Sequence, residues 1–150
     1  MLSRTAVLAL ALLTSAGSLL VAQEPAKAPP AARRVMDGLY SVEQATRGRA
    51  AYMKGCAECH MPDLGGKEYA GPLAGFGFQL KWADASVAEL YGRVRSMPLG
   101  RPGSMAPQEY LDIVAYILQK NEYPAGQEEL TGAVAGQRWP RILIERIITK

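Results

Sequence analysis

Apolar residues recur at helical spacing in three stretches of this chain. The first stretch begins at Ser41, where Gln44, three residues on, completes the reciprocal capping box of a helix N-terminus. The pattern continues to about Lys54. It therefore predicts a first helix from Ser41 to Lys54.

The second and third stretches have clear start signals and one apolar face each. The second begins at Ser86, and its apolar positions follow the i, i+3, i+4, i+7 spacing of a half-buried helix. These positions are Val87, Leu90, Tyr91 and Val94. The third follows Pro107, a residue suited to the first helical position, and ends near Asn121. Its apolar stripe consists of Tyr110, Ile113, Val114, Ile117 and Leu118. With these three helices we predict an all-α fold.

Residues 61–81 connect the first two predicted helices and are rich in glycine and aromatic residues. They show no strand alternation, which indicates an ordered loop. A loop of about 20 residues is long for a compact domain. We therefore expect it to wrap around a ligand that organises it.

The N-terminal segment has the layout of an export signal. Arg4 precedes an uncharged run rich in leucine and alanine, which ends before Glu24 and Pro25. This layout is typical of a secretory signal peptide, so we assign residues 1–22 to a signal peptide. An uncleaved membrane anchor is the alternative, because the run is near the minimum of about 17 to 20 residues for a span. Residues 23–39 hold several prolines and alanines and are predicted to be a linker.

The rest of the chain divides into a folded domain, residues 40–124, and a C-terminal extension, residues 125–150. Within the extension, residues 141–148 are apolar and β-branched. This composition suits a strand or extended arm that packs back on the domain, or else a docking segment for a partner. We expect packing.

Charge and composition narrow the candidate chemistry. The formal charge of +3 comes from 17 basic and 14 acidic residues. This near balance does not favour nucleic-acid binding, which needs a clustered basic face. The single histidine and the two cysteines all stand in one pentapeptide.

That pentapeptide is Cys56-Ala57-Glu58-Cys59-His60, a C-x-x-C-H pattern, which is the attachment sequence for c-type haem. Its two thiols add to the two haem vinyl groups, and the next residue places an imidazole over the iron. Attachment of this kind takes place outside the cytoplasm, in agreement with the export signal. We predict one covalent haem c, bound through Cys56 and Cys59, with His60 as an iron ligand.

Other uses of a C-x-x-C pair are weaker interpretations. A thioredoxin-like redox pair requires a βαβ context, whereas here the motif follows a helix and precedes a glycine-rich loop. A structural disulfide in an exported protein leaves the following histidine unexplained. A closed zinc site needs four ligands, usually Cys or His, and the chain has three such residues.

The second axial ligand must come from another residue type, because His60 is the only histidine. A methionine thioether is the usual alternative. Met97, followed by Pro98, and Met105 both lie between the second and third predicted helices, whereas the other methionines lie beside the motif or before the domain. We predict Met97 as the ligand and Met105 as a core residue.

Residues 40–124 resemble class I cytochrome c in the order helix, C-x-x-C-H, Gly-Pro loop, helix, Met-Pro, final helix. The resemblance implies a small fold of three main helices wrapped around one covalent haem, with residues 125–150 as an extra arm. It pairs Gly48 and Tyr52 of the first helix with Ile113 and Tyr116 of the last. It also implies that the carbonyl of Pro72 accepts the Nδ1 proton of the ligating histidine.

A narrower likeness links the segments around Trp82, Met97–Ser104 and Gln108–Leu118 to small bacterial cytochromes associated with quinoprotein alcohol and sugar dehydrogenases. The family comparison implies that the Trp82 indole N–H donates to a haem propionate, although packing on the haem or core is an equal alternative. Arg93 and Arg95 are expected to be solvated helix charges.

Together these observations predict an exported, periplasmic carrier of single electrons rather than an enzyme, with iron ligated by His60 and Met97. Expected partners are redox proteins such as a periplasmic dehydrogenase, whose electron-acceptor subunit it could be, or a terminal oxidase. Membrane association requires an uncleaved signal. The alternative function is a haem-based sensor of small ligands or a peroxidase-like enzyme with a labile sixth ligand. That role usually needs polar distal groups, and the sequence around Met97 offers no polar cluster.

Overall fold

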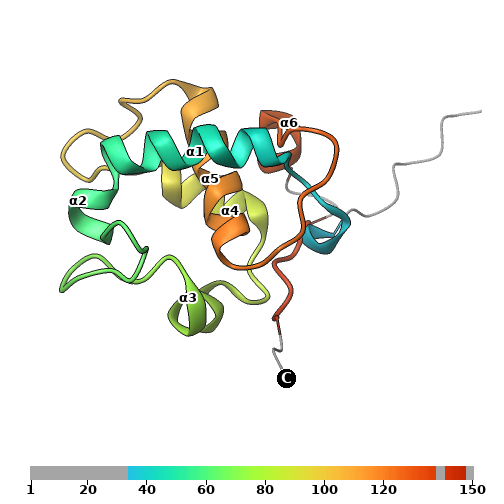
Figure 1. The fold of residues 1–150 in the computed structure, drawn as a ribbon, viewed down its shortest axis with the longest axis horizontal. Helices are drawn as coiled ribbons and strands as arrows, with labels where there is room; N and C mark the ends of the chain where they lie inside the picture. The colour runs from blue at the N-terminus through green and yellow to red at the C-terminus, as the bar shows by residue number, and fades with distance from the viewer. Residues whose placement is uncertain (1–33, 138–140, 148–150) are drawn as a thin grey trace, which may run out of the picture.

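The computed structural model describes residues 34–137 and 141–147. The predicted signal peptide, residues 1–22, and most of the predicted linker lie outside the described residues. The helices, in chain order, are η1 (a 3-10 turn, Val35–Asp37), α1 (Val42–Gly55), α2 (Ala57–His60), α3 (Gly75–Trp82), α4 (Val87–Arg95), α5 (Pro107–Lys120) and α6 (Gly132–Ala135). The described chain contains helices and no strand, so the all-α prediction is confirmed (Figure 1).

The three predicted helices are α1, α4 and α5, and their start signals act as expected except for one half of the capping box at α1. Ser41 caps α1 by accepting a hydrogen bond from the Gln44 N–H. Ser86 and Glu89 form a full capping box at α4. At α5, Pro107 takes the first position, and the Glu109 carboxylate accepts from the Ala106 N–H at 2.9 Å.

One half of the predicted box at α1 does not form. The Gln44 side chain is fully buried and pairs with the backbone of Leu130 instead, donating to its carbonyl and accepting from its N–H. This pairing satisfies two backbone groups of the C-terminal extension, a partner that no local pattern around Ser41 could indicate.

The core lies where α1 crosses α5 near their middles (Figure 1). The helices approach so closely at Gly48 that a Cβ atom there would lie 1.7 Å from the Asp112 carbonyl oxygen. One turn on, the rings of Tyr52 and Tyr116 meet at 5.4 Å between centroids. The expected pairing of Gly48 and Tyr52 with the last helix is therefore present, and Arg47 fixes it from outside with two hydrogen bonds to the Asp112 carboxylate.

The prediction of a loop over residues 61–81 is wrong at its C-terminal end, where α3 forms. Sequence patterning missed this helix because it is eight residues long and contains Gly75 and Gly77, which are poor helix formers. It buries Phe78 and Trp82, one turn apart, while Phe76 is 80% exposed. A short helix with so small a buried face leaves little periodicity to detect.

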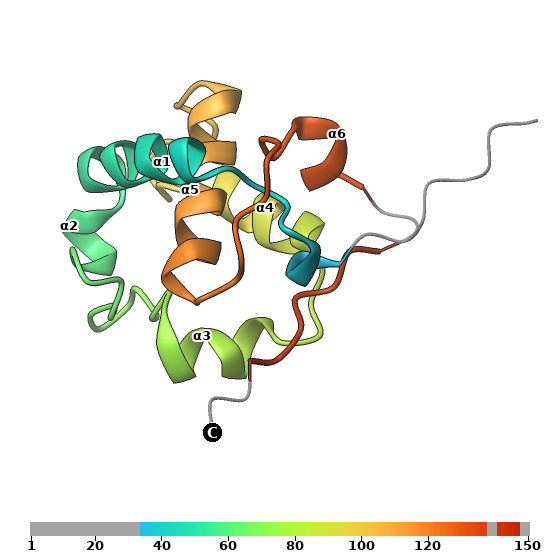
Figure 2. The ribbon, with the colours of Figure 1, turned by 45° about the vertical axis from the view of Figure 1, so that its right-hand side comes forward.

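The C-terminal extension packs back on the domain as an extended arm, as predicted. Residues 141–147 run along one side of the domain toward α3 (Figure 2). Ile142 and Ile144 are buried, and an antiparallel bridge joins Ser86 to Leu143. Val35 is also fully buried, and the neighbouring Arg34 pairs with Glu145 of the arm at 2.8 Å, so ordered packing begins within residues 23–39.

In residues 34–137 and 141–147 no helix has the length and apolar character that crossing a membrane requires.

Candidate functional site

The attachment motif stands at the corner between α1 and α2. Cys56 is the C-cap residue of α1 and the N-cap residue of α2, and His60 is the last residue of α2. The Cys59 and His60 N–H groups both donate to the Cys56 carbonyl, at 3.2 and 2.9 Å. This single turn brings the two thiols and the imidazole to one side of the backbone, where all three line a cavity.

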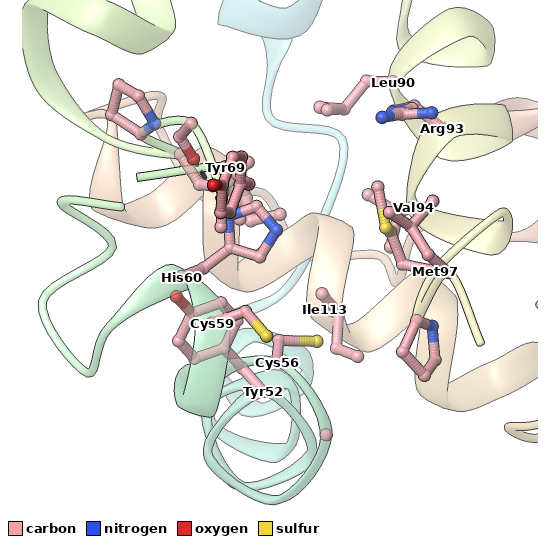
Figure 3. Close-up of a pocket in the computed structure, with 18 of the residues that line it drawn as sticks. Tyr52, Cys56, Cys59, His60, Tyr69, Leu90, Arg93, Val94, Met97 and Ile113 are labelled. Carbon is pink, nitrogen blue, oxygen red and sulfur yellow. Dashed lines mark hydrogen bonds between the residues drawn. The ribbon is translucent and has the colours of Figure 1, made fainter. Parts of the chain in front are cut away.

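The cavity has a volume of about 390 Å³, within the usual range for small-molecule sites of about 300–1,000 Å³. Its walls come from α1, α2, the 69–73 loop, α3, α4, the 97–100 segment and α5. Figure 3 shows His60 on one wall and Met97 on the opposite wall, with Cys56 and Cys59 at the edge between them. Leu90, Val94 and Ile113 make much of the remaining surface apolar.

His60 is oriented by the loop that follows it, but through a different residue from the one expected. Its Nδ1 lies 2.9 Å from the Gly71 carbonyl oxygen, not from that of Pro72. The loop is closed by a Leu73 N–H bond to the Leu64 carbonyl, which turns the carbonyl before the proline toward the imidazole. Pro72 instead lines the cavity. A carbonyl only accepts, so Nδ1 carries the proton and Nε2 keeps its lone pair for a metal.

The thiol environment does not suit a redox dithiol. No disulfide joins Cys56 to Cys59. Burial, with a smaller contribution from Cys59, raises the pKa of Cys56 to about 11. A reactive C-x-x-C cysteine has a lowered pKa instead, so this thiol is not activated for disulfide exchange.

The two candidate methionines occupy different places. Met97 lines the cavity. Met105 is partly buried against the core, with its sulfur 3.4 Å from where a Cβ on Gly55 would lie, and it is not among the lining residues. Of the two, Met97 is the one that faces the same space as His60.

Two features of the lining fit the carboxylates of a haem. Trp82 is 7% exposed, and its buried Nε1 finds no hydrogen-bond partner within the described residues. A buried donor without a partner costs about 1–3 kcal/mol, so this N–H calls for an acceptor. Among the described residues that line the cavity, Lys81 and Arg93 carry charge, and both are cationic.

Arg93 is exposed, as expected for a solvated helix charge, and it also lines the cavity (Figure 3), which the sequence analysis did not predict. The available signal was its spacing, because Leu90, Arg93, Val94 and Met97 follow one another at i, i+3, i+4 and i+7. Arg95 stays outside and lies over the Tyr91 ring at 5.7 Å.

Other metal chemistry finds no support in the described part of the chain. No group of three or more His, Cys, Asp or Glu side chains is close enough there to hold a metal ion. The donor set of the cavity is two thiols, one imidazole and one thioether, which is the set that a covalent haem requires.

Comparison with known proteins gives one family. The family model described as cytochrome c oxidase, cbb3-type, subunit III, matches residues 43–117, which is half of the chain. No curated protein and no solved structure matches the chain significantly. Because the matched region runs from the first turn of α1 into α5 and includes the attachment motif and most of the cavity wall, the chain belongs to this family and is a class I monohaem c-type cytochrome with covalently bound haem c.

Proposed function

We propose that this cytochrome is an exported carrier of single electrons whose haem iron is ligated by His60 and Met97. The observation that supports this ligand pair most directly is their placement on opposite walls of one cavity. His60 is the only histidine, and Met105 does not line the cavity.

Different residues of the cavity would bind different parts of the haem. Cys56 and Cys59 supply the thioether links, and the Gly71 carbonyl fixes the tautomer of His60. Trp82 offers its free indole N–H to a propionate, with Lys81 and Arg93 supplying positive charge nearby. When bound, the haem iron supplies the one-electron redox chemistry, with a potential set by ligand type, burial and hydrogen bonding.

The surroundings of Met97 favour electron transfer over sensing or peroxidase chemistry. Apart from Arg93, which we assign to the propionates, the lining residues near it in sequence and along α4 and α5 are apolar: they are Leu90, Val94, Pro98, Leu99, Ile113 and Ile117. A labile sixth position usually works with polar distal groups, and these residues offer none. A haem iron held by His60 and Met97 in these surroundings would be suited to accepting and releasing electrons without binding substrate.

We further propose that residues 1–22 direct export to the periplasm and are removed there. Covalent attachment of c-type haem outside the cytoplasm supports this location. Mass spectrometry of the intact mature protein tests it. Loss of a segment near residue 22 together with a mass gain of one haem agrees with the proposal, and a retained N-terminus in the membrane fraction contradicts cleavage.

Partners are redox proteins, and we propose a periplasmic dehydrogenase, in which the cytochrome would be the electron-acceptor subunit, or a terminal oxidase. Docking should be weak, since turnover requires release. Exposed Tyr69 and Leu99 line the cavity mouth and would lie within such an interface.

The decisive experiment is the optical spectrum of the oxidised and reduced holoprotein in the wild type, Met97→Ala and Met105→Ala. We expect the near-infrared sulfur-to-iron band in the wild type and in Met105→Ala, and its loss in Met97→Ala alone. Loss in Met105→Ala alone would reassign the ligand. A wild type that lacks the band and binds carbon monoxide readily when reduced would replace the carrier by a sensor or peroxidase.

A further inference from the structure

Helix α3 carries Trp82 and Lys81 into the cavity wall, yet within the described chain it makes only sparse contacts with the other helices. Phe78 and Trp82 are its only buried residues. Its first turn is held by Asn121, whose side chain accepts from the Gly75 N–H and donates to the Leu73 carbonyl. The rest of α3 needs another support.

The C-terminal arm provides one contact at the middle of α3. The Gln79 carboxamide donates to the Tyr123 hydroxyl at 3.0 Å and accepts from the Ile147 N–H at 3.3 Å. Tyr123 in turn donates to the Glu145 carbonyl at 2.6 Å. Gln79 is thus held on both sides by the chain that follows α5.

A second contact lies just beyond the end of α3. The Asp84 N–H donates to the Ile144 carbonyl at 2.9 Å, and the Ile144 N–H donates to the Ala85 carbonyl at 2.8 Å. The Ile144 side chain is fully buried. The Ala85 N–H donates to the carbonyl of Trp82, the last residue of α3, at 3.0 Å. The arm is therefore linked to the end of α3 through Ala85.

These two contacts flank Trp82, since Gln79 lies three residues before it and Ala85 three residues after it. Trp82 holds the buried indole N–H that lacks a partner within the described residues. The arm lies outside residues 43–117, the region that the family shares. Its contacts with α3 are therefore made from outside the matched region.

We propose that the C-terminal arm is a positioning element of the haem site, which fixes α3 so that the Trp82 indole N–H meets a haem propionate. Gln79 and Ile144 are the positioning residues. The inference rests on the proposed function in its assignment of Trp82 to a propionate. It gives the arm a role in setting the redox properties, beyond adding buried surface.

The test compares the reduction potential of the holoprotein, as a function of pH, in four single variants and one double variant. Gln79→Ala removes the side chain that makes the first contact. Ile144→Ala removes the buried side chain that anchors the backbone hydrogen bonds of the second contact, and Trp82→Phe removes the donor. Leu130→Ala is the matched control for Ile144→Ala, because Leu130 is a fully buried aliphatic residue of the extension that pairs with α1 instead. The near-infrared band, expected unchanged throughout, monitors the axial ligands.

We expect Gln79→Ala and Ile144→Ala to shift the potential and its pH dependence in the same direction as Trp82→Phe, by a smaller amount. Leu130→Ala should lower stability and leave the potential unchanged. In the double variant Gln79→Ala/Trp82→Phe, the Gln79 change should add no further shift, because a donor that is absent cannot be positioned.

Separate outcomes overturn separate statements. If Trp82→Phe shifts the potential while Gln79→Ala and Ile144→Ala lower only stability, or if the Gln79 shift persists in full in the double variant, the arm is not a positioning element. If Trp82→Phe leaves the potential and its pH dependence unchanged, the propionate contact itself is wrong, and the positioning proposal falls with it. Loss of the near-infrared band in the wild type would instead contradict the His60/Met97 assignment.

Discussion

The hydroxyl of Tyr110, in the first turn of α5, donates to the Met97 carbonyl at 3.0 Å. The Tyr110 hydroxyl oxygen also accepts a hydrogen bond from the Met105 N–H at 3.3 Å. One buried hydroxyl therefore joins the two ends of the segment that carries the proposed ligand. The Arg95 carbonyl, which accepts from the Gly103 N–H at 3.1 Å, closes the same segment from the α4 side.

Tyr110→Phe should loosen this segment without changing the core volume. We expect a loss of about 1 kcal/mol of stability, a weaker near-infrared band and faster carbon monoxide binding to the reduced protein, because Met97 leaves the iron more easily. Tyr40→Phe is the matched control. Its hydroxyl donates to the Tyr123 carbonyl at 2.6 Å, and Tyr40 is not among the cavity residues. Equal carbon monoxide kinetics in the two variants would contradict a role for Tyr110 in holding the ligand.

Gly48→Ala should destabilise the domain by about 3 kcal/mol. The added Cβ would lie 1.7 Å from the Asp112 carbonyl oxygen, so α1 and α5 would have to separate along the core. Denaturant unfolding of the holoprotein measures the effect. Gly92→Ala in α4 is the control, because a Cβ there meets nothing within 4 Å, and alanine should stabilise that helix by about 0.5–1 kcal/mol. A Gly48→Ala protein as stable as the wild type would mean that the helices do not cross as described.

Glu89 should make stability depend on pH in the acid range. Hydrogen bonds from the Ser86 hydroxyl and N–H, and then Arg141, lower the pKa of Glu89 to about 2. The unfolded value is about 4.3, so the carboxylate contributes stability above that pH and loses it as the pH falls toward 2. Glu89→Gln should be less stable than the wild type at neutral pH and show a flatter decline between about pH 4.5 and pH 2. Thermal unfolding of both proteins across this pH range measures the difference in stability. Parallel curves of stability against pH for the wild type and Glu89→Gln would refute the prediction.

Gln44→Ala should release the start of the C-terminal extension from α1. The change leaves the Leu130 N–H and carbonyl without their partners, at a cost of about 2 kcal/mol. Proteolytic cleavage after residue 124 should become faster, while the optical spectrum stays unchanged because Gln44 does not line the cavity. If the optical spectrum changed and the rate of proteolytic cleavage did not, then α1, rather than the extension, would depend on Gln44.

Local signals in the sequence determined the three long helices and the attachment chemistry. Caps at Ser41 and Ser86, the proline at the start of α5 and the apolar stripes all act within a few residues, so they can be read without knowledge of the fold. The C-x-x-C-H pattern is equally local, because one helical turn fixes the relation of its three side chains. The prediction that the extension packs back also followed from its apolar composition.

Tertiary structure alone decided which distant groups meet. The partner of His60 is the Gly71 carbonyl rather than that of Pro72, because closure of the loop turns one peptide and not the next toward the imidazole. The Gln44 side chain pairs with the backbone of Leu130, eighty-six residues away, instead of completing the capping box at Ser41. Helix α3 forms between Asn121 and the arm although its own pattern is weak. In each case the free energy comes from satisfying polar groups or burying side chains across the fold, and nothing near those positions in the sequence encodes the partner.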